Sequence, residues 1–118
     1  MSIRRVVPDI PTERMDESRK FYTEFLGFEV AMDMGWIITL ASPSNRTAQI
    51  SLLRGTAAPA AQPISLSIEV ADVDAAHAKA LALGLTILYP LTTEPFGIRR
   101  FHVADPNGVV LNVLSHSP

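Results

Sequence analysis

The feature that most constrains the fold of this chain is a short pattern that occurs twice. In each copy an aspartate precedes a helical stretch, a glycine ends it, and an apolar β-rich run follows. Residues 15–30 carry the first copy and residues 72–87 carry the second. Their closing glycines, Gly27 and Gly84, stand about half a chain length apart. Because self-similarity of this kind marks duplicated structural units, the sequence predicts two copies of one module.

The first half predicts a strand, a helix and three further strands. Asp16 is a good N-cap residue, so the helix is expected at about residues 17–26 and should end at Gly27. Its apolar stripe comprises Phe21, Tyr22, Phe25 and Leu26. The alternating residues 6–11 predict the first strand, and the others are expected at residues 28–31, 36–41 and 48–53. Pro8 and Pro11 predict an edge strand or a hinge, since proline cannot donate to a ladder.

The second half repeats this order after a predicted linker of small residues, 55–62, which lies between Arg54 and Pro63. A half-buried strand is expected at residues 64–70, followed by a helix that Asp72 caps and Gly84 ends. The predicted inner face of this helix comprises Val73, Ala76, Ala80 and Leu83. Three strands are expected at residues 85–89, 99–103 and 109–114, the last two joined by the turn at residues 105–108. The modules therefore span residues 1–56 and 57–118, within one compact domain.

Composition excludes several classes of function. A net charge of −2 provides no basic field for nucleic acid, and the absence of cysteine excludes disulfides and thiolate metal sites. No apolar run approaches the ~20 residues that span a bilayer, and no signal peptide is evident, so we expect a cytoplasmic protein with no membrane or nucleic-acid partner.

With these elements in place, the chain resembles the vicinal oxygen chelate superfamily, which includes glyoxalase I, extradiol dioxygenases and bleomycin-resistance proteins. The likeness is carried by residues 16–28, by residues 69–75 through Gly84, and by residues 96–101 through the turn at 105–108. It implies an α+β fold in which two βαβββ modules form a curved, mixed eight-stranded sheet around a cup, with the helices outside. It also implies a cup that a homodimer commonly completes.

The resemblance also allows the metal site of the family to be tested. In metal-dependent relatives the first and last strands of each module supply ligands, usually His or Glu. The corresponding first-strand positions are Val7 and Ser65, and the last-strand positions are Gln49 or Ser51 and then Asn112. Because these positions hold no carboxylate and no imidazole, we expect a cup without the family's metal and without a cofactor.

Other side chains are candidates for ligand contact. We expect the ligand-binding set to comprise Asp9, Trp36, Ser51, Ser65, Ser67, Phe96, Arg99, His102 and Asn112. His102 lies either in the cup, as a hydrogen-bonding group or general base, or on the other side of its strand. One of Arg99 and Arg100 should face inward, and alternation alone does not say which. Trp36 is either a stacking wall or part of the core, the core being the preferred interpretation. The remaining histidines are expected to be solvated, as His77, or frayed, as His116.

The leading hypothesis is a metal-independent small-molecule binding protein of the glyoxalase/bleomycin-resistance type, which holds an organic ligand in the cup or in a dimer groove. The alternative is a glyoxalase-like lyase or isomerase, or a dioxygenase. Such an enzyme would hold a divalent metal at unfamiliar positions such as Asp9, Glu69 and His102, or would use His102 as a base. A third possibility is a structural or regulatory partner of a larger enzyme. Exposed sheet edges and the prolines of the first strand favour a homodimer, with exchange of that strand as one arrangement.

Overall fold

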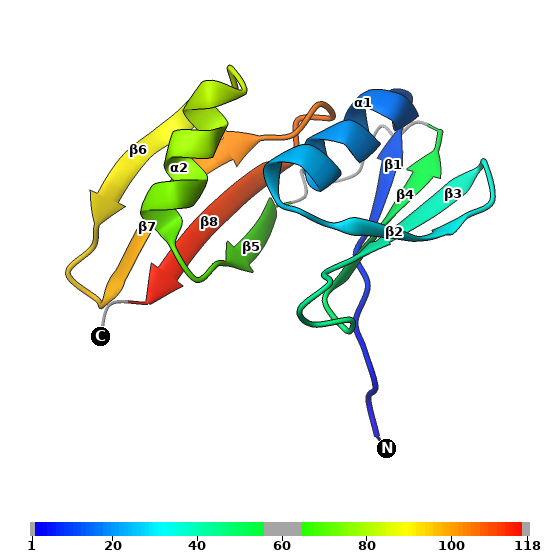
Figure 1. The fold of residues 1–118 in the computed structure, drawn as a ribbon, viewed down its shortest axis with the longest axis horizontal. Helices are drawn as coiled ribbons and strands as arrows, with labels where there is room; N and C mark the ends of the chain where they lie inside the picture. The colour runs from blue at the N-terminus through cyan, green and yellow to red at the C-terminus, as the bar shows by residue number, and fades with distance from the viewer. Residues whose placement is uncertain (1, 56–64, 117–118) are drawn as a thin grey trace. The chain divides into compact units, whose positions relative to one another are not determined.

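A computed structural model describes residues 2–55 and 65–116, and it divides the chain into two compact units, Met1–Ala61 and Gln62–Pro118 (Figure 1). In each unit one strand and one helical segment precede three further strands. The α+β class and the two βαβββ modules are therefore confirmed. The boundary expected between residues 56 and 57 lies outside the described residues.

The first unit contains a four-stranded mixed sheet with the order β1-β4-β3-β2. Its elements are β1 (Asp9–Thr12), α1 (Met15–Lys20), η1 (Phe21–Phe25), β2 (Glu29–Asp33), β3 (Ile37–Ala41) and β4 (Gln49–Arg54). Strand β1 is parallel to β4, and the other pairs are antiparallel. Tyr22 of the helical segment and Ile10, Leu40 and Leu52 of the sheet are fully buried, so these side chains form the core of the unit.

The second unit repeats this topology, with the order β5-β8-β7-β6. Its elements are β5 (Ser65–Glu69), α2 (Val73–Ala82), β6 (Ile87–Thr93), β7 (Ile98–Ala104) and β8 (Val110–His116). Strand β5 is parallel to β8, as β1 is to β4. The core side chains Phe101, Val103, Leu111 and Val113 are fully buried. The eight strands are thus divided between two sheets of four.

The start of the first helix differs from the prediction. Helix α1 begins at Met15, and Asp16 lies in its first turn instead of at its N-cap. The Thr12 hydroxyl accepts a hydrogen bond from the Arg14 backbone N–H at 2.9 Å and is 3.0 Å from the Ser18 hydroxyl. These contacts hold the chain before the helix, so the cap role predicted for Asp16 is wrong.

The second helix follows its sequence signals more closely. The Asp72 side chain accepts a hydrogen bond from the Ala75 backbone N–H at 3.0 Å, which confirms the predicted N-cap. Val73 and Ala80 are buried as predicted. Leu83 is 42% exposed, because the helix ends at Ala82 and Leu83 lies in the turn before Gly84. Gly84 has φ +71°, the left-handed conformation expected at a helix stop.

The first strand begins later than predicted. Residues 6–8 precede β1, which begins at Asp9. Pro8 has no N–H, and it takes part through its carbonyl, which accepts a hydrogen bond from the Ser51 N–H at 2.9 Å. Pro11 is accommodated because β1 is an edge strand. The helices in the described part of the chain are too short to cross a bilayer.

Candidate functional site

Alternation along β7 separates the two faces of the second sheet. Arg99 binds Asp74 of α2, and the Phe101 ring meets the ring of His77 of α2 with centroids 5.1 Å apart. Side chains of the opposite parity therefore face away from α2, among them Arg100 and His102. We call this side the distal face of the second sheet. The contact between His77 and Phe101 also corrects the expectation that His77 is simply solvated.

A row of four polar side chains crosses the distal face. The register pairs Ser67 of β5 with Asn112 of β8, Asn112 with His102 of β7, and His102 with Tyr89 of β6. The Asn112 amide group donates a hydrogen bond to the Ser67 hydroxyl at 3.2 Å. At the other end, the Tyr89 and His102 rings pack with centroids 5.0 Å apart. Hydroxyl, amide and imidazole groups thus lie along one line across all four strands.

Arg100 extends this row toward the hairpin between β6 and β7. Its guanidinium lies 5.5 Å from the ring centroids of both Tyr89 and Phe96. Its Nη2 atom is 3.6 Å from Oε2 of Glu94, whose side chain is only 11% exposed. The Tyr89 hydroxyl donates to Oε1 of the same carboxylate at 2.7 Å. The cation therefore lies near two aromatic rings and beside a nearly buried anion.

Two buried polar atoms of the distal face have no hydrogen-bond partner. They are Nε of Arg100, a donor, and Oδ1 of Asn112, an acceptor. Buried polar atoms without partners are uncommon in folded proteins, and each calls for an explanation. Both atoms belong to the distal face, and among residues 65–116 they are the two buried side-chain atoms without a partner.

The first sheet has an equivalent row with different chemistry. Asp9, Ser51, Thr39 and Met32 are paired in turn across β1, β4, β3 and β2. The Thr39 and Ser51 hydroxyls are buried and lie 2.8 Å apart, so each has a hydrogen-bond partner. Asp9, at the edge of the row, is exposed.

The register changes which first-strand residues belong to these rows. Counting back from the helices selected Val7 and Ser65, but Val7 precedes β1 and Ser65 is paired with Val110. The residues beside Ser51 and Asn112 are Asp9 and Ser67. Val7 and Ser65 therefore lie two residues before the members of these rows, because the count contained no information on how the parallel strands are aligned.

No group of three His, Asp or Glu side chains in residues 2–55 and 65–116 is arranged to hold a metal ion. Of the alternative metal set, Asp9 belongs to the first unit, while Glu69 and His102 belong to the second. Glu69 forms a pair with His116 at the end of β8, which also corrects the expectation that His116 is frayed.

The structure distinguishes the two adjacent arginines. Arg99, which was expected to bind the ligand, forms a 3.0 Å ion pair with Asp74 on the α2 face, and Arg100 is on the distal face. The hydrogen bond from Arg99 lowers the pKa of Asp74, and the same contact raises the pKa of Arg99. The apolar residues Phe101 and Val103 alternate with Arg100 and His102 along β7. This alternation is the feature of the sequence that indicates a shared face for Arg100 and His102. No comparable signal identified Tyr89 or its contact with Glu94.

Trp36 lies in the turn between β2 and β3 and is 58% exposed, so its assignment to the core is wrong. Met34 in the same turn is also exposed. A short turn offers few neighbours that could cover an indole ring. Phe96, in the turn between β6 and β7, is 63% exposed. Each unit therefore presents an exposed aromatic ring on a hairpin.

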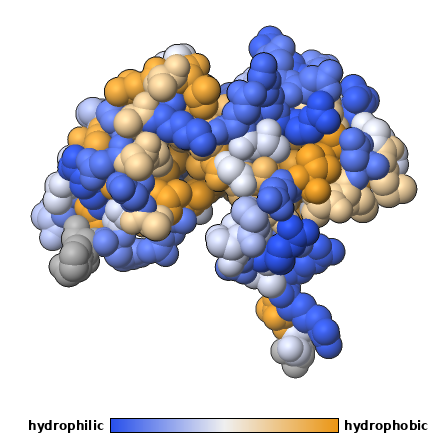
Figure 2. Space-filling model, in the orientation of Figure 1, coloured by the Kyte–Doolittle hydropathy of each residue, from blue (hydrophilic) through white to orange (hydrophobic). Residues whose placement is uncertain are grey.

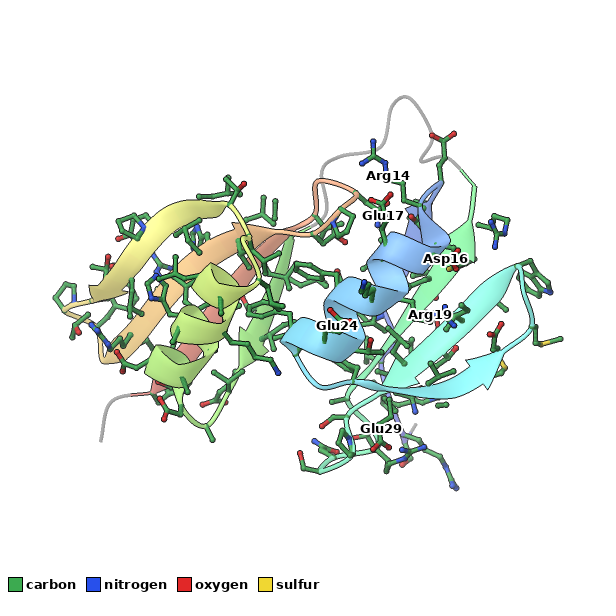
Figure 3. All side chains as sticks on the ribbon, turned by 45° about the horizontal axis from the view of Figure 1, so that its top comes forward. Arg14, Asp16, Glu17, Arg19, Glu24 and Glu29 are labelled. Carbon is green, nitrogen blue, oxygen red and sulfur yellow. The ribbon has the colours of Figure 1, made fainter. Side chains whose placement is uncertain are left out.

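The outer surface of α1 is hydrophilic (Figure 2). Charged side chains line the segment from the start of α1 to η1, among them Arg14, Asp16, Glu17, Arg19 and Glu24 (Figure 3). The pairs Arg14–Glu17 and Asp16–Arg19 are exposed, with 3.7 Å between their charged atoms. Such solvated i,i+3 pairs contribute little free energy and typify a helix surface facing water.

Comparison with known proteins adds an independent line of evidence. The sequence model of the Glyoxalase/Bleomycin resistance protein/Dioxygenase superfamily matches residues 2–113. No curated protein sequence matches the chain.

Solved structures with a similar fold include TioX from Micromonospora sp. ML1, with 18% identity, a TM-score of 0.82 and coverage of 97% of this chain and 99% of that one. TnmS3, an antibiotic binding protein from Streptomyces sp. CB03234, has 24% identity and a TM-score of 0.80, with coverage of 99% of this chain and 99% of that one. A glyoxalase/bleomycin resistance protein/dioxygenase from Nocardioides has 17% identity and a TM-score of 0.73, over 99% of this chain and 87% of that one.

Proposed function

Since the chain belongs to the Glyoxalase/Bleomycin resistance protein/Dioxygenase superfamily, we propose that it binds a small organic molecule without a metal ion. The molecule is held at the distal face of the second sheet, by Ser67, His102 and Asn112 together with Arg100. Of the expected ligand-binding residues, Arg99 is replaced by Arg100 in this proposal. Ser65 and Phe96 of the same unit remain candidate contacts, and the contacts expected of Asp9, Trp36 and Ser51 in the first unit stay predictions.

The observation that carries the proposal is the pair of unpartnered buried atoms on this face, Arg100 Nε and Asn112 Oδ1. In the free protein each atom is covered by its neighbours and carries a desolvation cost. A molecule that moves the covering side chains aside and supplies an acceptor to one atom and a donor to the other would satisfy both. The neighbouring rings of Tyr89 and Phe96 add apolar contact area. Few polar groups among apolar walls are typical of small-molecule sites.

The donor chemistry supports binding without a metal. The two rows offer hydroxyls, an amide, an imidazole and the carboxylate of Asp9, and this carboxylate and the imidazole belong to different units. A divalent ion requires three or four converging nitrogen or oxygen ligands, preferably carboxylates or imidazoles. Among solved structures of this fold, TnmS3 is described as an antibiotic binding protein, which is consistent with a binding role on this scaffold.

The proposal is tested by metal analysis of protein purified without chelators, combined with native mass spectrometry. We expect less than stoichiometric divalent metal and an additional mass from a co-purifying organic molecule. Loss of that mass in Asn112→Leu, with the unfolding temperature preserved, would locate the molecule at the distal face. A divalent ion retained at one per chain would contradict the proposal.

The second candidate function is an enzyme in which His102 acts as a general base. The observation that favours it is the position of His102 in the polar row, paired with Asn112 and packed against Tyr89. A histidine beside a bound molecule can exchange protons near neutral pH. His102→Gln separates the two functions, because glutamine keeps a hydrogen-bonding group at this position but cannot act as a base. A binding protein would then lose only part of its affinity, whereas an enzyme would lose turnover of the identified molecule.

A further inference from the structure

The two unpartnered atoms of the distal face are complementary in type, and this inference rests on the binding function proposed above. Arg100 Nε can only donate a hydrogen bond, and Asn112 Oδ1 can only accept one. Because Asn112 is paired with His102 and Leu114 with Arg100, the two residues are diagonal neighbours on adjacent strands. Such neighbours lie about 7–8 Å apart, within the span of one small molecule. A ligand at this site must therefore present an acceptor and a donor.

The charges around Arg100 restrict that ligand further. The Glu94 carboxylate lies 3.6 Å from the guanidinium and its side chain is 11% exposed, so the positive charge already has a desolvated partner. An anionic ligand at Arg100 would also meet Glu94, and a cationic ligand would meet Arg100 itself. Like charges brought together in a desolvated site oppose binding. A neutral acceptor such as a carbonyl oxygen avoids both repulsions.

Apolar surface adjoins the same groups. The Phe96 ring stands beside the Arg100 guanidinium and is 63% exposed, so one side of it remains available for contact. In the first sheet, Thr39 and Ser51 are the counterparts of His102 and Asn112, and their hydroxyls hydrogen-bond to each other. The donor and the acceptor on which the inference rests therefore both belong to the second unit.

We infer that the site recognises an uncharged amide-type group next to an aromatic or apolar moiety. The carbonyl oxygen accepts from Arg100 Nε, an N–H or O–H donates to Asn112 Oδ1, and the apolar moiety rests on Phe96. Neutral amides, lactams and capped peptides have this chemistry. Free carboxylic acids and amines do not.

Three probes that share one aromatic ring test the inference by NMR. N-acetylphenylalaninamide is neutral, N-acetylphenylalanine carries a carboxylate, and phenylalaninamide carries an ammonium group. We expect the neutral probe to shift the Arg100 Nε–H and Asn112 side-chain amide signals and to bind about tenfold more tightly than either charged probe. Arg100→Gln and Asn112→Leu should each weaken its binding about tenfold. Arg99→Gln, the same change one residue away on the α2 face, should leave it unchanged.

Arg100→Lys provides a second variant, because it keeps a positive charge beside Glu94 but lacks the Nε–H. Weakened binding in this variant, with an unchanged unfolding temperature, supports the inference even if Arg100→Gln unfolds. Equal or tighter binding of a charged probe overturns it, as does failure of the neutral probe to bind. A charged co-purifying molecule in native mass spectra would also overturn the neutral-ligand inference while leaving the proposed binding function intact. Stoichiometric metal would instead remove the binding function itself.

Discussion

Adjacent residues in this protein have different roles because a strand alternates its side chains between two faces. Arg99 and Arg100 have the same chemistry, yet one binds Asp74 of α2 and the other lies between Tyr89 and Phe96. The same alternation separates Phe101, which is buried, from His102 in the polar row. Substitutions at odd-numbered and even-numbered positions of β7 should therefore have different effects, because the two sets of side chains face opposite sides of the sheet.

The buried hydroxyl pair of the first sheet leads to the first prediction. Ser51→Ala should reduce the free energy of unfolding by about 1–3 kcal/mol, because it leaves the buried Thr39 hydroxyl without its partner. Thr39→Val combined with Ser51→Ala should recover part of this loss, since neither polar group then remains. Urea unfolding of the single and double variants measures the coupling. Strictly additive effects would contradict it, and Ser44→Ala, in the exposed pair of Ser42 and Ser44, serves as the control.

The Asp74–Arg99 pair predicts a dependence of stability on pH. Because the hydrogen bond from Arg99 lowers the pKa of Asp74 in the folded protein, the carboxylate binds its proton more readily after unfolding. The stabilisation is therefore present above the ordinary aspartate pKa and is lost as the pH falls through the folded value. The effect is small, since both groups are solvent-exposed.

We expect the unfolding midpoint of the unmodified protein to exceed that of Asp74→Asn at about pH 6, and we expect this difference to shrink at about pH 3, below the ordinary aspartate pKa. Urea titrations at the two pH values provide the measurement. A difference that persists undiminished in acid would show that the pair is not its source.

At the scale of elements, the two helices begin differently although their sequences look alike. The Asp72 side chain accepts a hydrogen bond from the Ala75 N–H, whereas Asp16 lies inside the first turn of α1. Asp72→Ala should therefore reduce the free energy of unfolding by about 1 kcal/mol. Asp16→Ala is the matched control and should change it by less than about 0.5 kcal/mol. Equal losses in the two variants, measured by thermal or urea unfolding, would reject this assignment.

Strand β6 shows how an irregular element positions a site. Between the pairs Tyr89–His102 and Thr92–Arg100, β6 contains one residue more than β7, which marks a bulge at Pro90 and Leu91. Proline cannot donate to the ladder, so a bulge is a position where it can be accommodated. The bulge lies between Tyr89 and Glu94, whose side chains are joined by a hydrogen bond. Sequence alternation did not reveal this arrangement.

At the scale of the whole molecule, the two sheets end in four edge strands, β1, β2, β5 and β6. All five residues of β2 are exposed, and β1 contains Pro11. Unpaired edges are normally protected, and association with a second copy is one way to achieve this. We therefore predict a homodimer, in which exchange of the N-terminal strand is one possible arrangement.

Light scattering coupled to size-exclusion chromatography tests the homodimer. The expected mass is twice the 12.8 kDa of one chain. A mass of one chain that persists at high protein concentration would contradict the prediction. The ligand inference would stand in that case, because all of its residues belong to the second unit.

The sequence by itself determined the duplicated βαβββ order, the Asp72 cap, the stops at Gly27 and Gly84 and the absence of cysteine chemistry. These features depend on local backbone preferences and on periodicity, which neighbouring residues encode. The tertiary structure decided the pairing of Asp9 with Ser51 and of Ser67 with Asn112. It also decided the exposure of Trp36, and the contacts of Glu94 with the Tyr89 hydroxyl and the Arg100 guanidinium. Strand register and bulges arise from contacts between residues far apart in the chain, so no local pattern specifies them.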